Sequence, residues 1–366
     1  MKIAIIGGGI NGLASSWKLA SKGFEVDLYE ESEILSQTSS SSSKLLHGGI
    51  RYLEYGHFKL VHESLLDRHK WLKMAPQFCK PIKIIIPLYK NSNRPSWILF
   101  LGTFLYKILA GRYSLGPNSW LSKKDTLELC PDIDSKKLKG SISFYDAQMN
   151  EDGLGNWVKE QASNNGVKIF DNTPINSFSR EGMLEVGNKK KRYDFIINAT
   201  GPWAEKNNIK NNIKTEYSLE LIRGSHLLID KKISNPFIFQ ELTGKRVVFV
   251  LPYLKNTLIG TTEVKHDLDS DNIQCSSDER DYLINLYNSK FSNPITKQDI
   301  ISEFSGLRPI VKKKDYKRSL NFIAASRESA IEVDEKVLTI YGGKWTSAPS
   351  LSDKVFLKIK ELSKKI

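Results

Sequence analysis

The chain begins with two short apolar runs that flank a glycine-rich turn and an amphipathic segment. Residues 3–6 and 26–29 are mostly apolar and predict two buried strands. Between them, Leu13, Trp17 and Leu19 fall on one face of a helix that starts directly after the glycines. The glycine turn therefore has a defined place between a strand and a helix.

The glycines of this turn have the spacing Gly7-x-Gly9-x-x-Gly12, which is typical of a dinucleotide-binding turn. Gly7 permits the tight turn, Gly9 lets the backbone approach a pyrophosphate, and Gly12 lets the helix pack close to the sheet. Free amides at the start of the helix attract phosphates. Glu30 ends the second strand, where a carboxylate accepts from ribose hydroxyls and repels the 2′-phosphate of NADP. The motif alone does not distinguish FAD from NAD.

Two later strands also end in small residues. Residues 193–198 run into Ala199-Thr200-Gly201, and residues 337–341 run into Gly342-Gly343 before a closing helix over about 348–362. Small residues at the carboxyl end of a strand suit the close approach of a cofactor. These turns strengthen the prediction of one cofactor site built from separated segments.

The pattern between residues 219 and 264 is different, because strands follow one another without helices. Segments 220–229, 246–251 and 257–262 predict strands, and the last two form a hairpin. We therefore predict a second, antiparallel sheet. A length of 366 residues suits about two domains.

The most apolar stretch, residues 97–110, is too short to span about 30 Å of hydrocarbon, and Lys107 interrupts it. Its length favours a buried helix over a helix that lies in a membrane interface.

The net charge indicates which binding partners to expect, and the cysteine content indicates the cellular compartment of the protein. Lys and Arg exceed Asp and Glu by 13, which favours an anionic partner, although scattered lysines of a basic proteome give the same excess. Three cysteines without a C-x-x-C pair fit a reducing compartment, and Met1-Lys2 leads directly into the first strand. We therefore expect no signal peptide, a cytoplasmic protein and no bound metal.

A serine-rich segment at residues 36–44 precedes a basic, glycine-bearing loop. Its position after the nucleotide strand argues against a simple flexible linker. Hydroxyls and amides there suit a cofactor phosphate, and they would hold His47 and Arg51 near the cofactor.

Together these segments resemble the FAD-dependent glycerol-3-phosphate dehydrogenases, within the D-amino-acid-oxidase-like flavoproteins. The similar segments occur in family order and cover nearly the whole chain. They are IAIIGGGINGLA, TSSSSSKLLHGGIRYLE, RPSWILFLGTFLYKILAGR, FYDAQMNEDGL, NATGPW, RGSHLLI, RVVFVLPY, TLIGTTEV, FSGLRPI and YGGKWTS.

The resemblance implies an α/β fold: a Rossmann-like FAD-binding domain with an inserted, mainly antiparallel β substrate domain. We expect residues 1–75, 140–214 and 304–366 to form the FAD-binding part, and residues 76–139 and 215–303 to form the substrate part. The C-terminal helical cap domain usual in the family is expected to be absent. The chain departs from the family pattern at Ser41, where an arginine is usual, at Glu328, where Asp is usual, and at Trp345, where an aliphatic residue is usual.

The resemblance also implies a set of FAD-binding residues. They are Gly7, Gly9, Asn11, Gly12, Glu30, Thr38, Ser39, Ser42, Lys44, Leu46, His47, Ala199, Thr200, Gly201, Gly342, Gly343, Lys344, Trp345 and Thr346.

The implied reaction is oxidation of sn-glycerol 3-phosphate to dihydroxyacetone phosphate by hydride transfer to FAD. Arg308 and Arg327 match the family's phosphate-binding arginines, and paired guanidiniums suit a phosphate dianion. Thr262 and Tyr52 are further substrate-binding candidates. The catalytic candidates are His47, Arg51, His226 and Lys344. Either of the two histidines could be the base that takes the hydroxyl proton.

The family passes electrons to quinone at a membrane face, or to oxygen in its oxidase branch. The resemblance therefore leaves three interactions open: quinone as the acceptor, a peripheral contact with the inner face of the cell membrane, and a homodimer. No nucleic acid partner is expected. Two other functions stay open. One is a flavoprotein of the same fold acting on an amine or a 2-hydroxy acid, and the other is a basic flavin-binding module without turnover.

Overall fold

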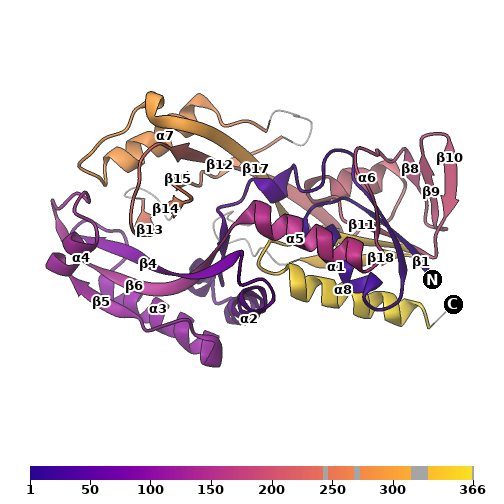
Figure 1. The fold of residues 1–366 in the computed structure, drawn as a ribbon, viewed down its shortest axis with the longest axis horizontal. Coiled ribbons are helices and arrows are strands. Elements are labelled where there is room, and N and C mark those ends of the chain that lie inside the picture. The colour runs from indigo at the N-terminus through magenta and orange to yellow at the C-terminus, as the bar shows by residue number, and fades with distance from the viewer. Residues whose placement is uncertain (242–245, 268–272, 315–328, 365–366) are drawn as a thin grey trace.

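The structure, a computed structural model, describes residues 1–241, 246–267, 273–314 and 329–364. It contains two large sheets side by side, with the start of the chain and the end of helix α8 (Ala348–Leu362) near each other beside the first sheet (Figure 1). Arg327 and Glu328, singled out from the sequence, lie outside the described residues.

The first sheet has six strands in the order β18-β19-β11-β1-β2-β7. Their bounds are β18 Ala330–Asp334, β19 Val337–Tyr341, β11 Phe195–Asn198, β1 Lys2–Ile6, β2 Glu25–Tyr29 and β7 Lys168–Phe170. All neighbours are parallel except β18, which runs antiparallel to β19. The carboxyl ends of β1, β11 and β19 therefore meet at one edge, which brings together the three small-residue turns predicted from the sequence.

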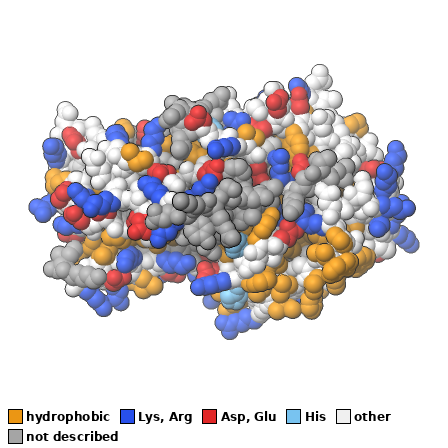
Figure 2. Space-filling model, turned by 180° about the vertical axis from the view of Figure 1, so that it is seen from behind, with side chains coloured by type: hydrophobic (Ala, Val, Ile, Leu, Met, Phe, Trp, Pro, Cys, Tyr) orange, Lys and Arg blue, Asp and Glu red, His pale blue; other side chains and the backbone are white. Residues whose placement is uncertain are grey.

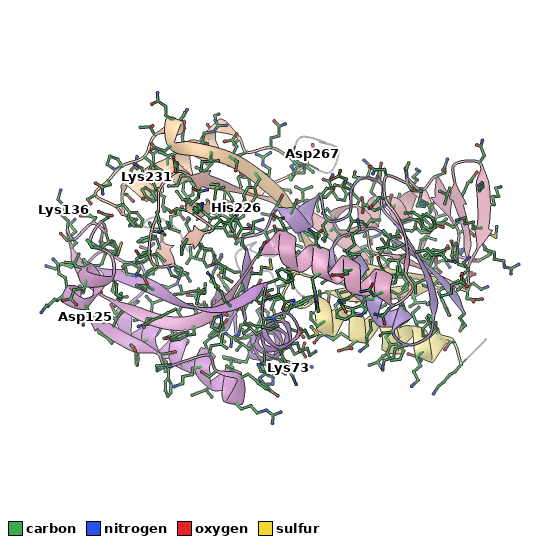
Figure 3. All side chains as sticks on the ribbon, in the orientation of Figure 1. Lys73, Asp125, Lys136, His226, Lys231 and Asp267 are labelled. Carbon is green, nitrogen blue, oxygen red and sulfur yellow. The ribbon has the colours of Figure 1, made fainter. Side chains whose placement is uncertain are left out.

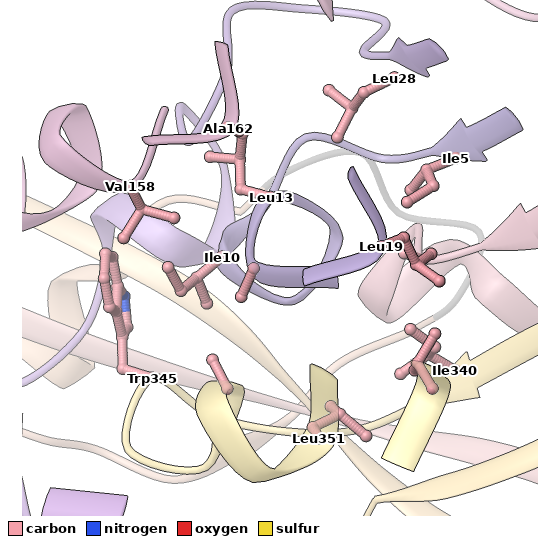
Figure 4. Packing of buried hydrophobic residues seen from close by; sticks show 14 of the residues in the cluster. Ile5, Ile10, Leu13, Leu19, Leu28, Val158, Ala162, Ile340, Trp345 and Leu351 are labelled. Carbon is pink, nitrogen blue, oxygen red and sulfur yellow. The ribbon is translucent and has the colours of Figure 1, made fainter. Parts of the chain in front are cut away.

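Three helices pack together beside this sheet: α1 (Ile10–Ala20), α5 (Glu151–Asn164) and α8 (Ala348–Leu362). Figure 4 shows their contact around Ile10, Leu13, Val158, Trp345 and Leu351, which are all buried. This apolar core fixes the helix that follows the glycine turn against the sheet, so the turn itself is held rigidly.

The second sheet has the order β16-β12-β15-β14-β13-β4-β6-β3, with β17 paired to β12 and β5 paired to β6. Its strands are β3 Leu45–Leu46, β4 Cys79–Tyr89, β5 Ser119–Ser122, β6 Leu138–Met149, β12 Tyr217–Ile229, β13 Phe237–Gln240, β14 Val247–Tyr253, β15 Asn256–Gly260, β16 Val264–Lys265 and β17 Ile300–Lys313. The predicted hairpin is present as β14 and β15, and every pairing except that of β13 with β4 is antiparallel.

The remaining elements lie around these sheets. They are α2 Phe58–Met74, α3 Ser96–Ala110, α4 Lys123–Leu129, α6 Ala204–Lys210 and α7 Ser277–Asn288, the hairpin strands β8 Ser177–Phe178, β9 Met183–Val186 and β10 Lys189–Arg192, and the short 3-10 turns η1 Thr38–Ser40, η2 Ile50–Tyr55, η3 Gly111–Tyr113, η4 Gly201–Trp203 and η5 Lys297–Asp299.

Three segments that we assign from the sequence to the FAD-binding part lie in the second sheet instead. The first is β3 at residues 45–46, which pairs with β6. Residues 140–149 belong to β6, which pairs with β4 as far as Met149, and residues 304–313 belong to β17, which pairs with β12. Long paired strands continue through both expected boundaries, and the local sequence pattern did not reveal this pairing. The division into two parts otherwise remains a proposal.

The apolar stretch at 97–110 forms the predicted helix, α3, but the expectation that it is buried is wrong. Trp97, Leu101, Phe104 and Ile108 are 65%, 55%, 46% and 57% exposed. These positions follow one face of the helix, and only the opposite face packs on the second sheet, in part through Tyr106. Figure 2 shows the hydrophobic side chains gathered over this end of the molecule, at the lower right.

Candidate active site

A cavity of about 850 Å³ connects the two sheets. At one end it is lined by the turns after β1, β2 and β11, including Gly9, Glu30 and Gly201. At the other end it is lined by side chains from one face of the second sheet, including His226 on β12 (Figure 3) and Phe249 on β14. The cavity thus joins a nucleotide-binding turn to a second chemical environment.

The glycine turn has the conformation that its sequence predicts. Gly7 has φ +106°, and a Cβ added there would lie 2.5 Å from the carbonyl oxygen of Ala199 in the neighbouring turn. A Cβ on Gly12 would lie 1.9 Å from the carbonyl oxygen of Gly7. Both glycines are therefore required by close backbone contacts, and Gly12 packs against the turn itself rather than lining the cavity.

Replacing Gly12 with alanine is expected to abolish cofactor retention, because the new methyl group would force the turn open. The cofactor absorbance per protein after gel filtration measures this. Gly102→Ala in helix α3 is the matched control, since a Cβ there meets no atom within 4 Å. A Gly12→Ala protein that keeps a full complement of cofactor would contradict the assignment of the turn.

The cavity fits the nucleotide end of a dinucleotide. Gly9, at the N-cap of helix α1, has no side chain to cap the helix. The amide of Ile10 donates to Ser39 Oγ at 3.0 Å, and the positive end of the helix dipole suits a phosphate. Asn11 lines the cavity, and its buried Oδ1 has no hydrogen-bond partner within the described part of the chain. Glu30 is held in place by the amides of Gly8 (2.6 Å) and Ser32 (3.0 Å), and its oxygens keep lone pairs for ribose hydroxyls.

Most of the predicted site residues line this cavity. They are Gly7, Gly9, Asn11, Glu30, Thr38, Ser39, Ser42, His47, Arg51, Tyr52, Ala199, Thr200, Gly201, His226, Arg308, Gly342, Gly343, Lys344, Trp345 and Thr346.

Lys44 and Leu46 do not line the cavity, although we predicted that they bind the cofactor. Lys44 Nζ is buried and pairs with Glu151, while Leu46 is fully buried in the apolar core. Lys44 also donates to the carbonyl oxygen of Ser40 at 2.7 Å. Lys44 therefore links the serine-rich loop to Glu151 at the start of α5, whereas Leu46 belongs to the core.

Thr262, which we predicted to bind the substrate, does not line the cavity. Its hydroxyl donates to Glu279 Oε1 at 2.6 Å and accepts from the amide of Ser225 at 2.8 Å, and the residue is 2% exposed. Its neighbours Thr261 and Glu263 line the cavity instead.

Arg51 and Arg308 converge on one point of the cavity wall. Glu263 Oε1 lies 3.4 Å from Arg51 Nη1 and 3.9 Å from Arg308 Nη1. Arg308 is further held by the hydroxyl of Thr261 and by the carbonyl oxygen of Thr262. Two guanidiniums therefore lie together in the cavity wall, and paired guanidiniums suit an anion such as a phosphate. The sequence analysis missed Glu263, although it lies within the TLIGTTEV segment.

The two candidate histidines have different environments. His47 is half-buried and lines the cavity in the loop after β3, where its amide donates to Thr346 Oγ1 at 3.1 Å. His226 is 1% exposed, its Nε2 lies 2.9 Å from Ser43 Oγ, and its ring stacks on Phe304. Burial, with the nearby charges of Arg308 and Lys44, holds the pKa of His226 well below its ordinary value.

This lowered pKa predicts a loss of stability in mild acid. Below about pH 6.5 the unfolded chain takes up a proton on His226 and the folded chain does not, so the free energy of unfolding falls as the pH falls. Between pH 6.5 and about 5.5, the wild type should lose about 1 kcal/mol more than His226→Gln in urea unfolding. Burial raises the pKa of Glu151 and Asp146, which acts in the opposite direction but equally in both proteins. Parallel curves for the two proteins would contradict the prediction.

The fold and this site define an FAD-binding oxidoreductase. The chain belongs to the family described as FAD dependent oxidoreductase, whose model matches residues 2–349, and its cofactor is FAD. Among the described residues, no group of three or more His, Cys, Asp or Glu is placed to hold a metal ion.

Individual relatives are similar over nearly the whole chain. D-erythritol 1-phosphate dehydrogenase of Brucella abortus is 32% identical, and aerobic glycerol-3-phosphate dehydrogenase of Escherichia coli is 30% identical. Each match covers 98% of this chain and 73% of the relative.

Two solved structures have a similar fold. Glycerol-3-phosphate dehydrogenase from Bacillus halodurans has a TM-score of 0.77 at 22% sequence identity. Glycine oxidase from Geobacillus kaustophilus has a TM-score of 0.76 at 17% identity. The matches cover 100% and 99% of this chain, and 64% and 94% of those chains.

Proposed function

We propose that this protein oxidises sn-glycerol 3-phosphate to dihydroxyacetone phosphate, with FAD as the hydride acceptor. The observation that carries the proposal is the convergence of Arg51 and Arg308 on one point of the cavity that also contains the nucleotide turn. Relatives that act on short phosphorylated polyols, at about 30% identity, support it.

The phosphate group is proposed to bind Arg308 and Arg51. Two guanidiniums offer paired N–H groups to the oxygens of a dianion, whereas a single carboxylate needs only one such group. Glu263 holds both side chains toward the cavity before the substrate binds, so little ordering is required on binding. Arg327 remains a proposed second contact from the sequence resemblance alone.

His47 is the base that we favour. A base becomes positively charged when it takes the hydroxyl proton, and His226 would have to carry that charge while fully buried near Arg308 and Lys44. His47 lines the same cavity and is partly exposed. His226 is then a positioning residue: its ring stacks on Phe304, and its Nε2 orients the hydroxyl of Ser43 through a hydrogen bond.

The cofactor supplies the acceptor for the hydride that leaves carbon 2 of the substrate. The turns at 7–12, 199–201 and 342–346, with Glu30, are proposed to hold it. Lys344 lines the cavity beside Tyr52, with its Nζ 5.4 Å from the centre of the tyrosine ring. Lys344 and Arg51 are thus placed to offset negative charge that develops as the hydroxyl proton leaves.

Steady-state turnover with a soluble dye as electron acceptor tests the proposal. Sn-glycerol 3-phosphate is expected to be turned over, with sarcosine, glycine, D-amino acids and 2-hydroxyglutarate inactive. D-erythritol 1-phosphate is the informative competitor, because it shares the phosphate and the secondary alcohol. Turnover of an amine or a 2-hydroxy acid, but not of a phosphate ester, would contradict the proposal. No turnover with any substrate would favour a non-catalytic flavin-binding module.

The physiological acceptor is proposed to be a membrane quinone, reached by a protein that docks on the cytoplasmic face of the membrane. The exposed face of α3 supports docking, because Trp97, Leu101 and Ile108 form an apolar stripe, with the basic residues Lys107 and Arg112 close by in sequence. Within the described ranges, no helix combines the length and apolar character that a membrane crossing needs. A homodimer also remains a proposal, which light scattering would test.

Two serines on this face are expected to weaken membrane binding. Burying each large apolar side chain in lipid contributes about 1.5–3 kcal/mol, so Leu101→Ser with Ile108→Ser should reduce binding to anionic vesicles by at least roughly tenfold. Vesicle flotation measures the bound fraction. The matched control is Ile209→Ser with Leu357→Ser, which are 63% and 61% exposed elsewhere. Equal losses in both double variants would show that α3 is not the docking face.

A further inference from the structure

One arm of the cavity holds a buried amide that nothing satisfies. Gln240, at the end of β13, is 7% exposed and lines the cavity. Among the residues that the structure describes, neither its Nε2 nor its Oε1 has a hydrogen-bond partner. A buried polar group without a partner is costly, so such a group points to a ligand that completes it.

The side chains around this amide are apolar. Ile238 lies two residues before Gln240 on the same strand face, and Val247 pairs with Gln240 on β14. Ile84 and Ile86 of the neighbouring strand β4 also line the cavity. These described residues therefore place one amide among aliphatic side chains, with the ion pair of Arg94 and Glu54 elsewhere in the cavity lining. This combination suits a flat apolar ring that carries polar groups at its edge.

This arm is distant from the proposed substrate site. Gly260 pairs with both His226 and Phe249, and Phe249 pairs with Ile238, so these residues form a row across four neighbouring strands. At about 4.8 Å per strand, Ile238 lies about 14 Å from His226, and Gln240 is two residues further along β13. Arg308 lies on β17, which pairs with β12, so a three-carbon phosphate ester held there leaves Gln240 available to a second molecule.

The mouth of this arm is also apolar. Ile98 and Leu101 of α3 line the cavity and are 41% and 55% exposed, so the proposed membrane-facing helix borders the opening. An occupant that arrives dissolved in lipid would meet this edge first.

We infer that the apolar arm at Gln240 binds the ring of an isoprenoid quinone. An amide serves both redox forms, because Nε2 donates to a quinone carbonyl and Oε1 accepts from a quinol hydroxyl. The electron balance agrees, since oxidation of the alcohol releases two electrons and two protons and reduction of a quinone to the quinol takes up two of each. The inference rests on the proposed function and specifies where its acceptor binds.

Binding of a short-chain ubiquinone to the FAD-loaded protein, measured by isothermal titration calorimetry, tests this site. Gln240→Leu is expected to weaken binding roughly five- to tenfold, because the ring loses a hydrogen-bonding partner in the wall. The same exchange at the exposed Gln77 is the control and should leave binding unchanged. The thermal midpoint of Gln240→Leu should not fall, since the variant removes an unsatisfied buried amide, whereas a structural role for Gln240 would lower it.

Two further readouts separate this inference from the proposed function. Turnover of sn-glycerol 3-phosphate with a soluble dye should be unchanged in Gln240→Leu, and saturating sn-glycerol 3-phosphate should leave quinone binding unchanged. Absence of quinone binding to the wild type, equal affinity in wild type and Gln240→Leu, or displacement of the quinone by the substrate would each overturn the inference. Failure of the substrate to be oxidised would leave the quinone titration interpretable and would count against the proposed function alone.

Discussion

Arg308→Ala is expected to lower kcat/KM for sn-glycerol 3-phosphate by roughly 10²- to 10⁴-fold. Hydrogen bonds to charged groups contribute about 1.5–3 kcal/mol each, and a guanidinium makes two to a phosphate. The loss should appear mainly in KM, because the phosphate is held in the same way in the ground state and in the transition state. Steady-state kinetics with a soluble dye measures both constants.

Arg308→Lys separates charge from geometry at this position. It retains the positive charge but loses the planar fork, so it should recover only part of the affinity. Arg192→Ala is the matched control, since Arg192 is exposed on the β9–β10 hairpin and is not among the residues that line the cavity. FAD content should be unchanged in all three variants. An unchanged KM in Arg308→Ala would contradict the proposal that Arg308 binds the phosphate of the substrate.

His47→Gln is expected to lower kcat by roughly 10²- to 10⁴-fold, which is the usual contribution of a general base. Glutamine keeps the size and polarity of the side chain and cannot accept the proton at neutral pH. The loss should be smallest at high pH, where hydroxide in solution can take the proton directly. The pH dependence of kcat measures this.

The matched variant for the second histidine is His226→Gln. An amide keeps a hydrogen bond to Ser43 Oγ, so this variant should retain most of kcat while changing the acid stability described above. The opposite result, with a large loss of kcat in His226→Gln and a small one in His47→Gln, would reverse the two roles. Equal FAD content in both proteins excludes loss of the cofactor as the cause.

The cofactor end of the site could be predicted from the sequence because it is local. A strand, a glycine turn and a helix lie within twenty residues, and the conformation of Gly7 and the contact of Gly12 follow from that short segment. The turns at 199–201 and 342–346 carry the same local signature, and parallel strands bring their ends to one edge.

The substrate end could be predicted only in part, because it depends on pairing between distant segments. Thr262 and Glu263 are neighbours, and the sequence does not show which of them faces the cavity; the hydrogen bonds of Thr262 to Ser225 and Glu279 decide it. The exposure of α3 was missed for a related reason. Its apolar residues surround most of the helix, so the pattern alone does not reveal which face lacks a partner.

The most direct test of the central claim is anaerobic addition of sn-glycerol 3-phosphate to the FAD-loaded protein while its visible flavin absorbance is followed. The account predicts that the absorbance falls with wild-type protein, and that Arg308→Ala needs a much higher concentration for the same change. An absorbance that stays constant in the wild type with this alcohol would contradict the account.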